Sequence, residues 1–185
     1  MPVLGLYWAD ASSIGPVQVN DIYKQNWNDN LSRSPRADFY RSYKRNFALS
    51  PFLEIVTIKS HRVALTRLLT SSHRLRIETG RWERPTPPPR HQRLCQYCKK
   101  MDDEYHFVIE CKLVNSLRIK LIPKYYWEHP SMFKFISLLN SENEKILLRL
   151  AEFTKKGFEI IKQRVLYPET ICIFSYINMP HSIWH

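Results

Sequence analysis

Four metal-ligating side chains lie close together in the second half of this chain: Cys95, Cys98, His106 and Cys111. Two thiols separated by two residues can both face inward from one tight turn, and an imidazole and a third thiol follow shortly after. Three thiolates and one imidazole form a ligand set that Zn²⁺ binds tetrahedrally, so the spacing predicts a Zn²⁺ site. Four protein ligands leave no open position for water or substrate, and we therefore expect a structural rather than a catalytic metal.

The cysteine content leaves other interpretations to be weighed. A disulfide framework is disfavoured, because the chain has four cysteines, of which only Cys172 lies outside the cluster, and no secretory segment is recognisable at its start. Cys172, His181 and His185 form a looser second group, whose spacing supports a metal site poorly. The remaining alternative for the cluster is that its thiols and His106 are inert side chains of the core.

The sequence also indicates how the four ligands are held. Residues 93–97 are expected to form the first arm of a short β-knuckle, and Asp102 or Asp103 to begin a helix by accepting hydrogen bonds from its free N–H groups. His106 and Cys111 would lie on the first turns of that helix. A separation of five residues does not bring two side chains onto one face of an ideal α-helix, so we predict a distorted helix at these ligands.

Positive charge is concentrated just before the cysteines. The chain has 185 residues and a formal net charge of +11, and residues 59–93 hold nine lysines and arginines against two glutamates, a net charge of +7. Arginine dominates this segment, and its planar guanidinium suits phosphates and base edges, so we predict a nucleic-acid partner, RNA or DNA. The expected contacts are Arg62, Arg67, Arg74, Arg76, Arg81, Trp82, Arg84, Arg90 and Arg93. A solvated charged face is the alternative.

Hydrophobic spacing and helix-boundary signals predict a mainly α fold, a helical domain with a small β-knuckle and helix zinc module. We expect a loose N-terminal segment, a basic helical region, a Pro-rich connector with the CCHC zinc module, C-terminal helices and a tail, over residues 1–18, 19–84, 85–122, 123–167 and 168–185.

Two helices are predicted in the N-terminal part. The first covers residues 21–27 and is followed by a polar break over residues 28–35. The second carries Phe39, Tyr43 and Phe47 at a spacing of four, which is typical of a helix face that lies in a core.

Two later helix starts are explicit in the sequence. Ser50 followed by Pro51 combines an N-cap hydroxyl with proline at the first helical position. Ser141 and Glu144 form a capping box that opens the most strongly amphipathic helix of the chain, and Pro168 is expected to end it.

Four blocks follow one another along residues 20–163. They are DIYKQNW from Asp21, ALTRLLTSSHRLRIETGRW from Ala64, the cysteine and histidine run with DEYHF inside it, and PSMFKFI from Pro130. Together they resemble the C-terminal region of non-LTR (LINE-type) retrotransposon reverse transcriptases. The resemblance implies a region that follows a polymerase, helps to bind template RNA or target DNA, and uses the three cysteines and the histidine as metal ligands.

No catalytic motif accompanies these blocks in the sequence. Asp102 and Asp103 do not form the clustered aspartates of a polymerase, and the motifs of ribonuclease H, of an endonuclease and of a phosphate-binding loop are also missing. No apolar stretch is long enough for a membrane span. We therefore expect an intracellular protein, nuclear or cytoplasmic, without enzymatic activity or a membrane partner.

Two alternative functions follow from the same features. The zinc module can serve protein interaction, with the Phe39 and Tyr43 stripe or the helix over residues 146–161 docking a protein partner. The chain can also be a decayed transposon sequence without a selected function.

Overall fold

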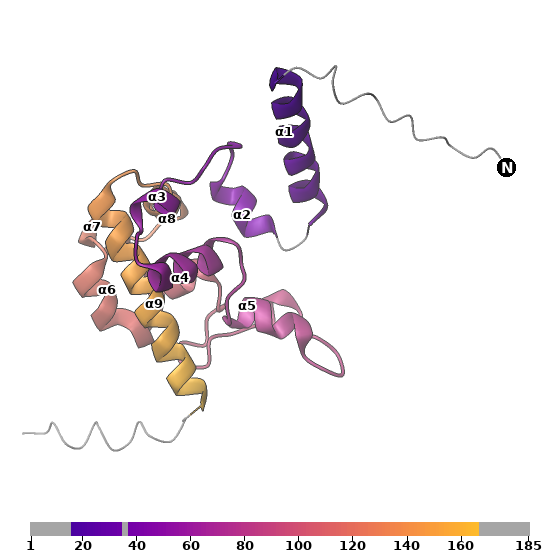
Figure 1. The fold of residues 1–185 in the computed structure, drawn as a ribbon. Coiled ribbons are helices and arrows are strands. Elements are labelled where there is room, and N and C mark those ends of the chain that lie inside the picture. Colours follow the sequence, from indigo (N-terminus) through magenta and orange to yellow (C-terminus); the bar gives the residue numbers. More distant parts are fainter. Residues whose placement is uncertain (1–15, 35–36, 167–185) are drawn as a thin grey trace, which may run out of the picture. The chain divides into compact units, whose positions relative to one another are not determined.

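The computed structural model describes residues 16–34 and 37–166 and is mainly helical, as the sequence predicts (Figure 1). The chain divides into two compact units, Met1–Leu49 and Ser50–His185. The predicted division into five segments is finer than this and stays a prediction. The segment 168–185 and residues 1–15 lie outside the described part of the chain.

The first unit contains α1 (Pro16–Arg33) and α2 (Asp38–Tyr43). The first helix is longer than predicted at both ends: it starts within the segment predicted to be loose and continues through most of the polar run predicted to break it. Asparagine and serine lower helix stability by less than about 1 kcal/mol per residue, so they weaken a helix without ending it. The Ser32 hydroxyl donates to the Asn28 carbonyl at 2.8 Å, which keeps this polar group satisfied inside the helix.

The second helix is shorter than predicted. It ends at Tyr43, which is buried, whereas Phe47 lies beyond the helix and is 43% exposed. The prediction that Phe47 continues a buried helical stripe is therefore wrong. Its ring instead lies 5.7 Å from the Trp27 ring, and Trp27 also contacts the Tyr40 ring edge-on at 6.4 Å. Aromatic contacts thus hold the helices of this unit together.

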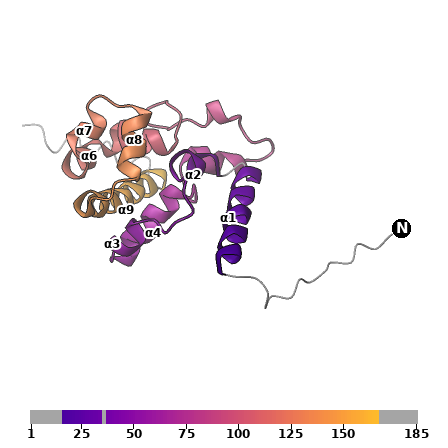
Figure 2. The ribbon, with the colours of Figure 1, turned by 90° about the horizontal axis from the view of Figure 1, so that it is seen from above.

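The second unit is built around one long helix, α9 (Glu144–Leu166). Figures 1 and 2 show α3 (Phe52–Ile55) and α4 (Lys59–Leu69) on one side of α9, and α6 (Asn115–Leu121) on the other. These three helices pack directly against α9. A helix does start here, as predicted, but one residue later: α3 begins at Phe52, Pro51 rather than Ser50 takes the N-cap position, and no side chain caps the helix.

The core of the second unit lies along the inner face of α9. Leu147, Leu150 and Phe153 have at most 2% of their surface exposed, as the amphipathic pattern predicts. The helix start differs in detail from the predicted capping box. The Asn143 side chain, not Ser141, accepts from a free N–H of the first turn, that of Ile146 at 3.2 Å, while the Ser141 hydroxyl accepts from the N–H of Asn143. Asparagine is as good an N-cap as serine, so the nearer residue takes the position.

Short helices connect these elements: α5 (Arg76–Thr79), η3 (Gly80–Trp82), η4 (Arg90–Gln92), η5 (His106–Glu110), η6 (Lys112–Val114), α7 (Lys124–Trp127) and α8 (Met132–Leu139). Over residues 16–34 and 37–166 there is no β-strand, so the predicted β-knuckle is not seen there; Leu94 and Met101 form only an isolated antiparallel bridge. None of the helices in the described ranges combines the length and apolar character that a membrane crossing requires.

Candidate metal centre

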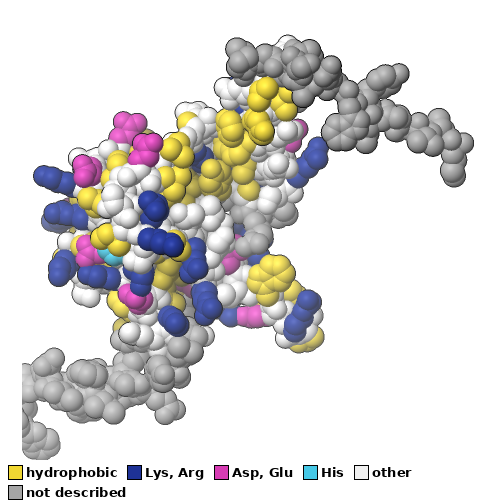
Figure 3. All heavy atoms as spheres, in the orientation of Figure 1, with side chains coloured by type: hydrophobic (Ala, Val, Ile, Leu, Met, Phe, Trp, Pro, Cys, Tyr) yellow, Lys and Arg dark blue, Asp and Glu magenta, His cyan; other side chains and the backbone are white. Residues whose placement is uncertain are grey.

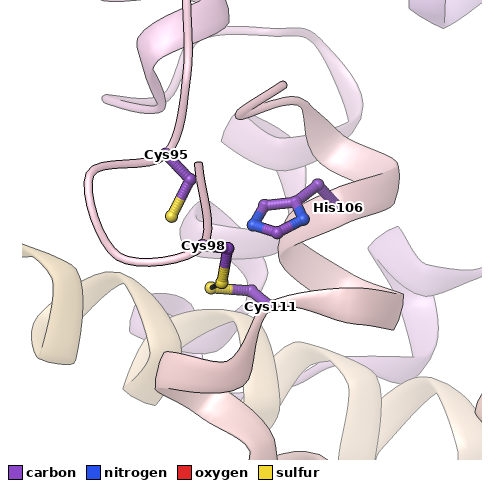
Figure 4. A group of neighbouring side chains, drawn as sticks. All are labelled: Cys95, Cys98, His106 and Cys111. Carbon is purple, nitrogen blue, oxygen red and sulfur yellow. Dashed lines mark hydrogen bonds between the residues drawn. The ribbon is translucent and has the colours of Figure 1, made fainter. Parts of the chain in front are cut away.

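The four predicted ligands come together in space. The ligand atoms of Cys95, Cys98, His106 and Cys111 all lie within 4.8 Å of one another, and the Sγ atoms of Cys98 and Cys111 are 3.8 Å apart. Figure 4 shows the side chains turned toward a common centre from a turn, a helix and the residue after that helix. Sulfur atoms bound tetrahedrally at about 2.3 Å from zinc lie about 3.8 Å apart, so part of the cluster already has the spacing of a metal site.

A tight turn positions the first two thiols. The N–H of Cys95 donates to the Lys100 carbonyl at 2.7 Å, and the N–H of Lys99 donates back to the Cys95 carbonyl at 2.9 Å. Lys99 adopts a left-handed conformation with φ of 57°, which reverses the chain direction. Cys95 and Cys98 consequently face the same side of the turn, as their spacing predicts.

A π-helix positions the other two ligands. Asp103 starts this helical segment, because its carboxylate accepts from the N–H of His106 at 2.8 Å. Residues His106–Glu110 form η5, a π-helix, and the N–H of Cys111 donates to the His106 carbonyl at 2.7 Å. The predicted N-cap and the predicted distortion are both confirmed. The wider π-turn is the backbone solution to placing ligands five residues apart on one side of a helix.

The surroundings of His106 fit a metal ligand. Both ring nitrogens of His106 are buried and have no hydrogen-bond partner among the described residues. Buried polar atoms are normally satisfied, and coordination by the imidazole would satisfy one of them. The described residues of the cluster thus fit an ion that accepts thiolate and imidazole ligands.

The thiols influence each other strongly. A hydrogen bond with Cys111 lowers the pKa of the Cys95 thiol, and the same contact raises the pKa of Cys111. Burial alone would lower the pKa of His106, but the adjacent Cys95 thiolate raises it above its ordinary value. The N–H of Lys112 donates to Cys98 Sγ at 3.3 Å. A metal would replace the shared protons of this cluster.

Two buried side chains that the sequence analysis did not identify, Ser71 and His73, hold the metal module in place. The Glu104 carboxylate accepts from the Ser71 hydroxyl at 2.6 Å and lies 2.9 Å from the His73 imidazole. Both partners come from the segment after α4, inside the block from Ala64. Burial alone would raise the pKa of the Glu104 carboxyl, but the hydrogen bonds from His73 and Ser71 outweigh it and lower this pKa. The sequence signal was the polar run at residues 70–73 within an otherwise apolar helix pattern.

The predicted arginines divide into two groups in the structure: some are held by hydrogen bonds or ion pairs within the fold, and the others are exposed. Arg62 and Arg93 are half-buried and bond to backbone carbonyls: Arg62 reaches those of Leu53 and Val56 at 3.4 Å, and Arg93 reaches that of Ile77 at 2.9 Å. Their guanidinium groups are thus used inside the fold. Sequence composition counts such arginines as available, although hydrogen bonds within the protein occupy them.

Two further predicted arginines form ion pairs. Arg76 pairs with Glu83, and Arg81 pairs with Glu78 at 3.1 Å, so the two glutamates of this segment each neutralise an arginine. The N–H of Arg76 also donates to the Asp102 carboxylate at 2.8 Å. This bond ties α5 to the residue that follows the cysteine turn.

The other predicted contacts are exposed: Arg67, Trp82, Arg84, Arg90 and, between α4 and α5, Arg74. The Trp82 side chain is 67% exposed, far above what a core tryptophan shows. Figure 3 shows hydrophobic and Lys or Arg side chains side by side on the loop next to α5. We call these four arginines and Trp82 the exposed basic set. Their side chains are accessible to a ligand.

Cys172, His181 and His185, the loose second group, lie outside the described residues. Comparison of the chain with protein-family models, with curated proteins and with solved structures gave no match in any of the three.

Proposed function

We propose that this chain is a zinc-binding, non-catalytic module that binds RNA or DNA, and that it resembles in this respect the region that follows the polymerase in non-LTR retrotransposon reverse transcriptases. One observation carries the proposal. A cluster of three thiols and an imidazole, largely buried, directly follows along the chain a segment that exposes arginines and a tryptophan.

The ligand set supports Zn²⁺ as the metal. Zinc takes thiolate and imidazole nitrogen in tetrahedral geometry and imposes no further geometric preference. Four protein ligands favour a structural role. In this proposal, the ion stabilises the turn that the isolated bridge between Leu94 and Met101 closes.

The exposed basic set supports nucleic acid as the partner. Arg84 and Arg90 flank a Pro-rich loop, and Trp82 precedes it, so charge for phosphates and a flat surface for a base lie on one short segment. Neither arginine has an ion-pair partner among the described residues.

Backbone contacts connect the two parts of the proposal. The N–H of Asp102 donates to the Arg93 carbonyl at 2.9 Å, and the N–H of Ile77 donates to the Asp102 carbonyl at 3.1 Å. These bonds join the cysteine turn to α5, which leads directly into Trp82. Zinc would therefore fix the orientation of the exposed basic set relative to the helices.

The zinc content of the purified chain tests the metal. Native mass spectrometry is expected to find one zinc ion in the wild type and none in Cys111→Ser. Cys172→Ser, which changes the cysteine outside the cluster, is the control and is expected to retain zinc. A folded wild type without zinc would remove the basis of the proposal.

Salt dependence tests the partner. Affinities for a single-stranded RNA, a single-stranded DNA and a duplex are measured by fluorescence anisotropy between low and moderate salt. Binding through phosphates is expected to weaken linearly on a logarithmic plot, with a slope of about −0.7 to −0.9 per phosphate contact. Absence of binding to all three at low salt would refute a nucleic-acid function.

One observation favours a protein partner as the second candidate. Tyr125, Met132 and Phe133 are exposed around α7 and α8, and Phe133 is 76% exposed. The Lys134 ammonium lies 4.6 Å from the centre of the Tyr125 ring, so a cation borders these exposed apolar side chains. By contrast, the two docking faces that the sequence suggests are partly used inside the fold. Tyr43 is buried, and the apolar face of α9 forms the core. A protein complex insensitive to salt would support this candidate.

A further inference from the structure

Arg118 is the buried cation next to the metal centre. Its side chain in α6 is 3% exposed, and it is the one buried lysine or arginine among the residues whose burial the structure describes. A buried charge is unfavourable unless hydrogen bonds and an opposite charge compensate for it. The surroundings of Arg118 therefore call for a physical explanation.

The hydrogen bonds of Arg118 go to the backbone of the π-helix. Its Nε donates to the Val108 carbonyl and its Nη2 to the Cys111 carbonyl, both at 2.7 Å. Two longer bonds reach the Asn115 side chain from Nη1 at 3.2 Å and the Phe107 carbonyl from Nη2 at 3.5 Å. No carboxylate accepts from this guanidinium in the described part of the chain, so its bonds are to neutral oxygens.

The π-turn explains why the Val108 carbonyl needs such a donor. In an α-helix this carbonyl would accept from the N–H of Lys112, but that N–H donates to the Cys98 sulfur instead. The N–H of Cys111, which an α-helix would direct to Phe107, donates to His106. Placing the metal ligands thus deprives the helix end of donors, and Arg118 supplies one.

The zinc-bound cluster would supply the negative charge that the buried Arg118 guanidinium needs. Zn²⁺ with three thiolates and a neutral imidazole carries a net charge of −1, and Cys98 and Cys111 are two of those thiolates. The nearby cations Lys100 and Lys112 are exposed, and Lys100 already pairs with Glu110 at 3.0 Å. The Asp102 carboxylate adds negative charge and accepts from the backbone N–H of Arg76. Arg118 is left as the internal cation of the site.

We propose that Arg118 is the counter-cation and positioning residue of the metal centre: it offsets the negative charge of the Cys3His zinc site and holds the carbonyls that the π-helix frees. This inference rests on the zinc site proposed above and deepens it. A surrounding residue of this kind typically changes metal affinity by about 10- to 100-fold.

The test separates charge from hydrogen bonding in the full-length chain. Zinc dissociation constants are measured by competition with a chromophoric chelator for wild type, Arg118→Lys and Arg118→Gln. Lysine keeps the charge, whereas glutamine keeps a donor without it. Arg149→Gln, an exposed arginine of α9, is the matched control and is expected to bind zinc as the wild type does.

We expect the glutamine variant to bind zinc at least about 10-fold more weakly than the wild type, with the lysine variant between the two. Glutamine and lysine variants of equal affinity would overturn the charge role. If the glutamine variant does not fold, the lysine variant decides alone: a loss within about 10-fold supports the proposal, and a larger loss overturns it. Absence of zinc from the wild type would instead overturn the proposed zinc site itself.

Discussion

The cysteine cluster and the arginine segment differ in how well the sequence predicts where their side chains lie. In the cluster, all four predicted ligands converge within 4.8 Å. In the segment over residues 62–93, four of the eight predicted arginines are held by carbonyls or glutamates, and the other four are exposed. Local backbone geometry brings together the residues of a short motif. Which side chains of a charged segment remain exposed depends instead on their contacts with the rest of the fold.

The same difference explains the contrast between Arg118 and the exposed arginines. No feature of the sequence singles out Arg118, yet the fold buries it against the cluster. Arg84, in the most basic segment, is exposed. Charge density along a sequence therefore does not show which arginines the fold leaves exposed.

Cys98→Ser tests the cluster and has the largest expected effect. Structural zinc contributes about 10–16 kcal/mol of apparent binding free energy in small zinc modules, and that energy is coupled to local folding. We expect loss of zinc by native mass spectrometry and loss of hydrogen-exchange protection across residues 93–117. Retained protection in the metal-free variant would show that the turn and the π-helix fold without an ion.

Arg93→Ala tests whether the internal arginines stabilise the fold. The change leaves the Ile77 carbonyl without its charged donor and removes the stem that packs against Gly80, where an added Cβ would lie 2.9 Å from the Arg93 side chain. We expect the free energy of unfolding to fall by about 2–3 kcal/mol in urea denaturation.

Arg84→Ala is the matched control for that measurement, because this exposed side chain is expected to change stability by less than about 0.5 kcal/mol. Equal destabilisation by both substitutions would remove the distinction between internal and exposed arginines.

Trp82→Ala tests base stacking on the exposed basic set. Loss of one stacked base is expected to weaken single-strand binding by about 1–2 kcal/mol, with stability unchanged, in the anisotropy titration. Phe133→Ala, which removes an exposed aromatic side chain from α8, is the control and is expected to bind normally. The reverse pattern would move the binding surface to α8.

Arg84→Gln gives the smallest expected effect and measures a single phosphate contact. We expect the slope of the salt dependence to fall by about 1, with a small loss of affinity at moderate salt. Arg149→Gln on α9 is expected to leave the slope unchanged. A slope that responds to Arg149 instead would place the phosphates along α9.

Much of the fold was predictable from local signals. Hydrophobic spacing located α9, and the five-residue separation of His106 and Cys111 predicted a distorted helix, which is the π-helix η5. The prediction was wrong where local preferences are weak: asparagines did not end α1, and Phe47 did not extend α2. Such preferences amount to fractions of a kcal/mol per residue, so other interactions override them.

The sequence by itself determined the mainly helical class and the four side chains that can hold a metal, because helical periodicity and ligand spacing act over a few residues. Only the tertiary structure decided which arginines remain exposed, that Ser71 and His73 meet Glu104, and that Arg118 is buried beside Cys111. Each of these contacts joins residues of different elements. Their formation depends on how the helices pack around α9, and no local pattern encodes that packing.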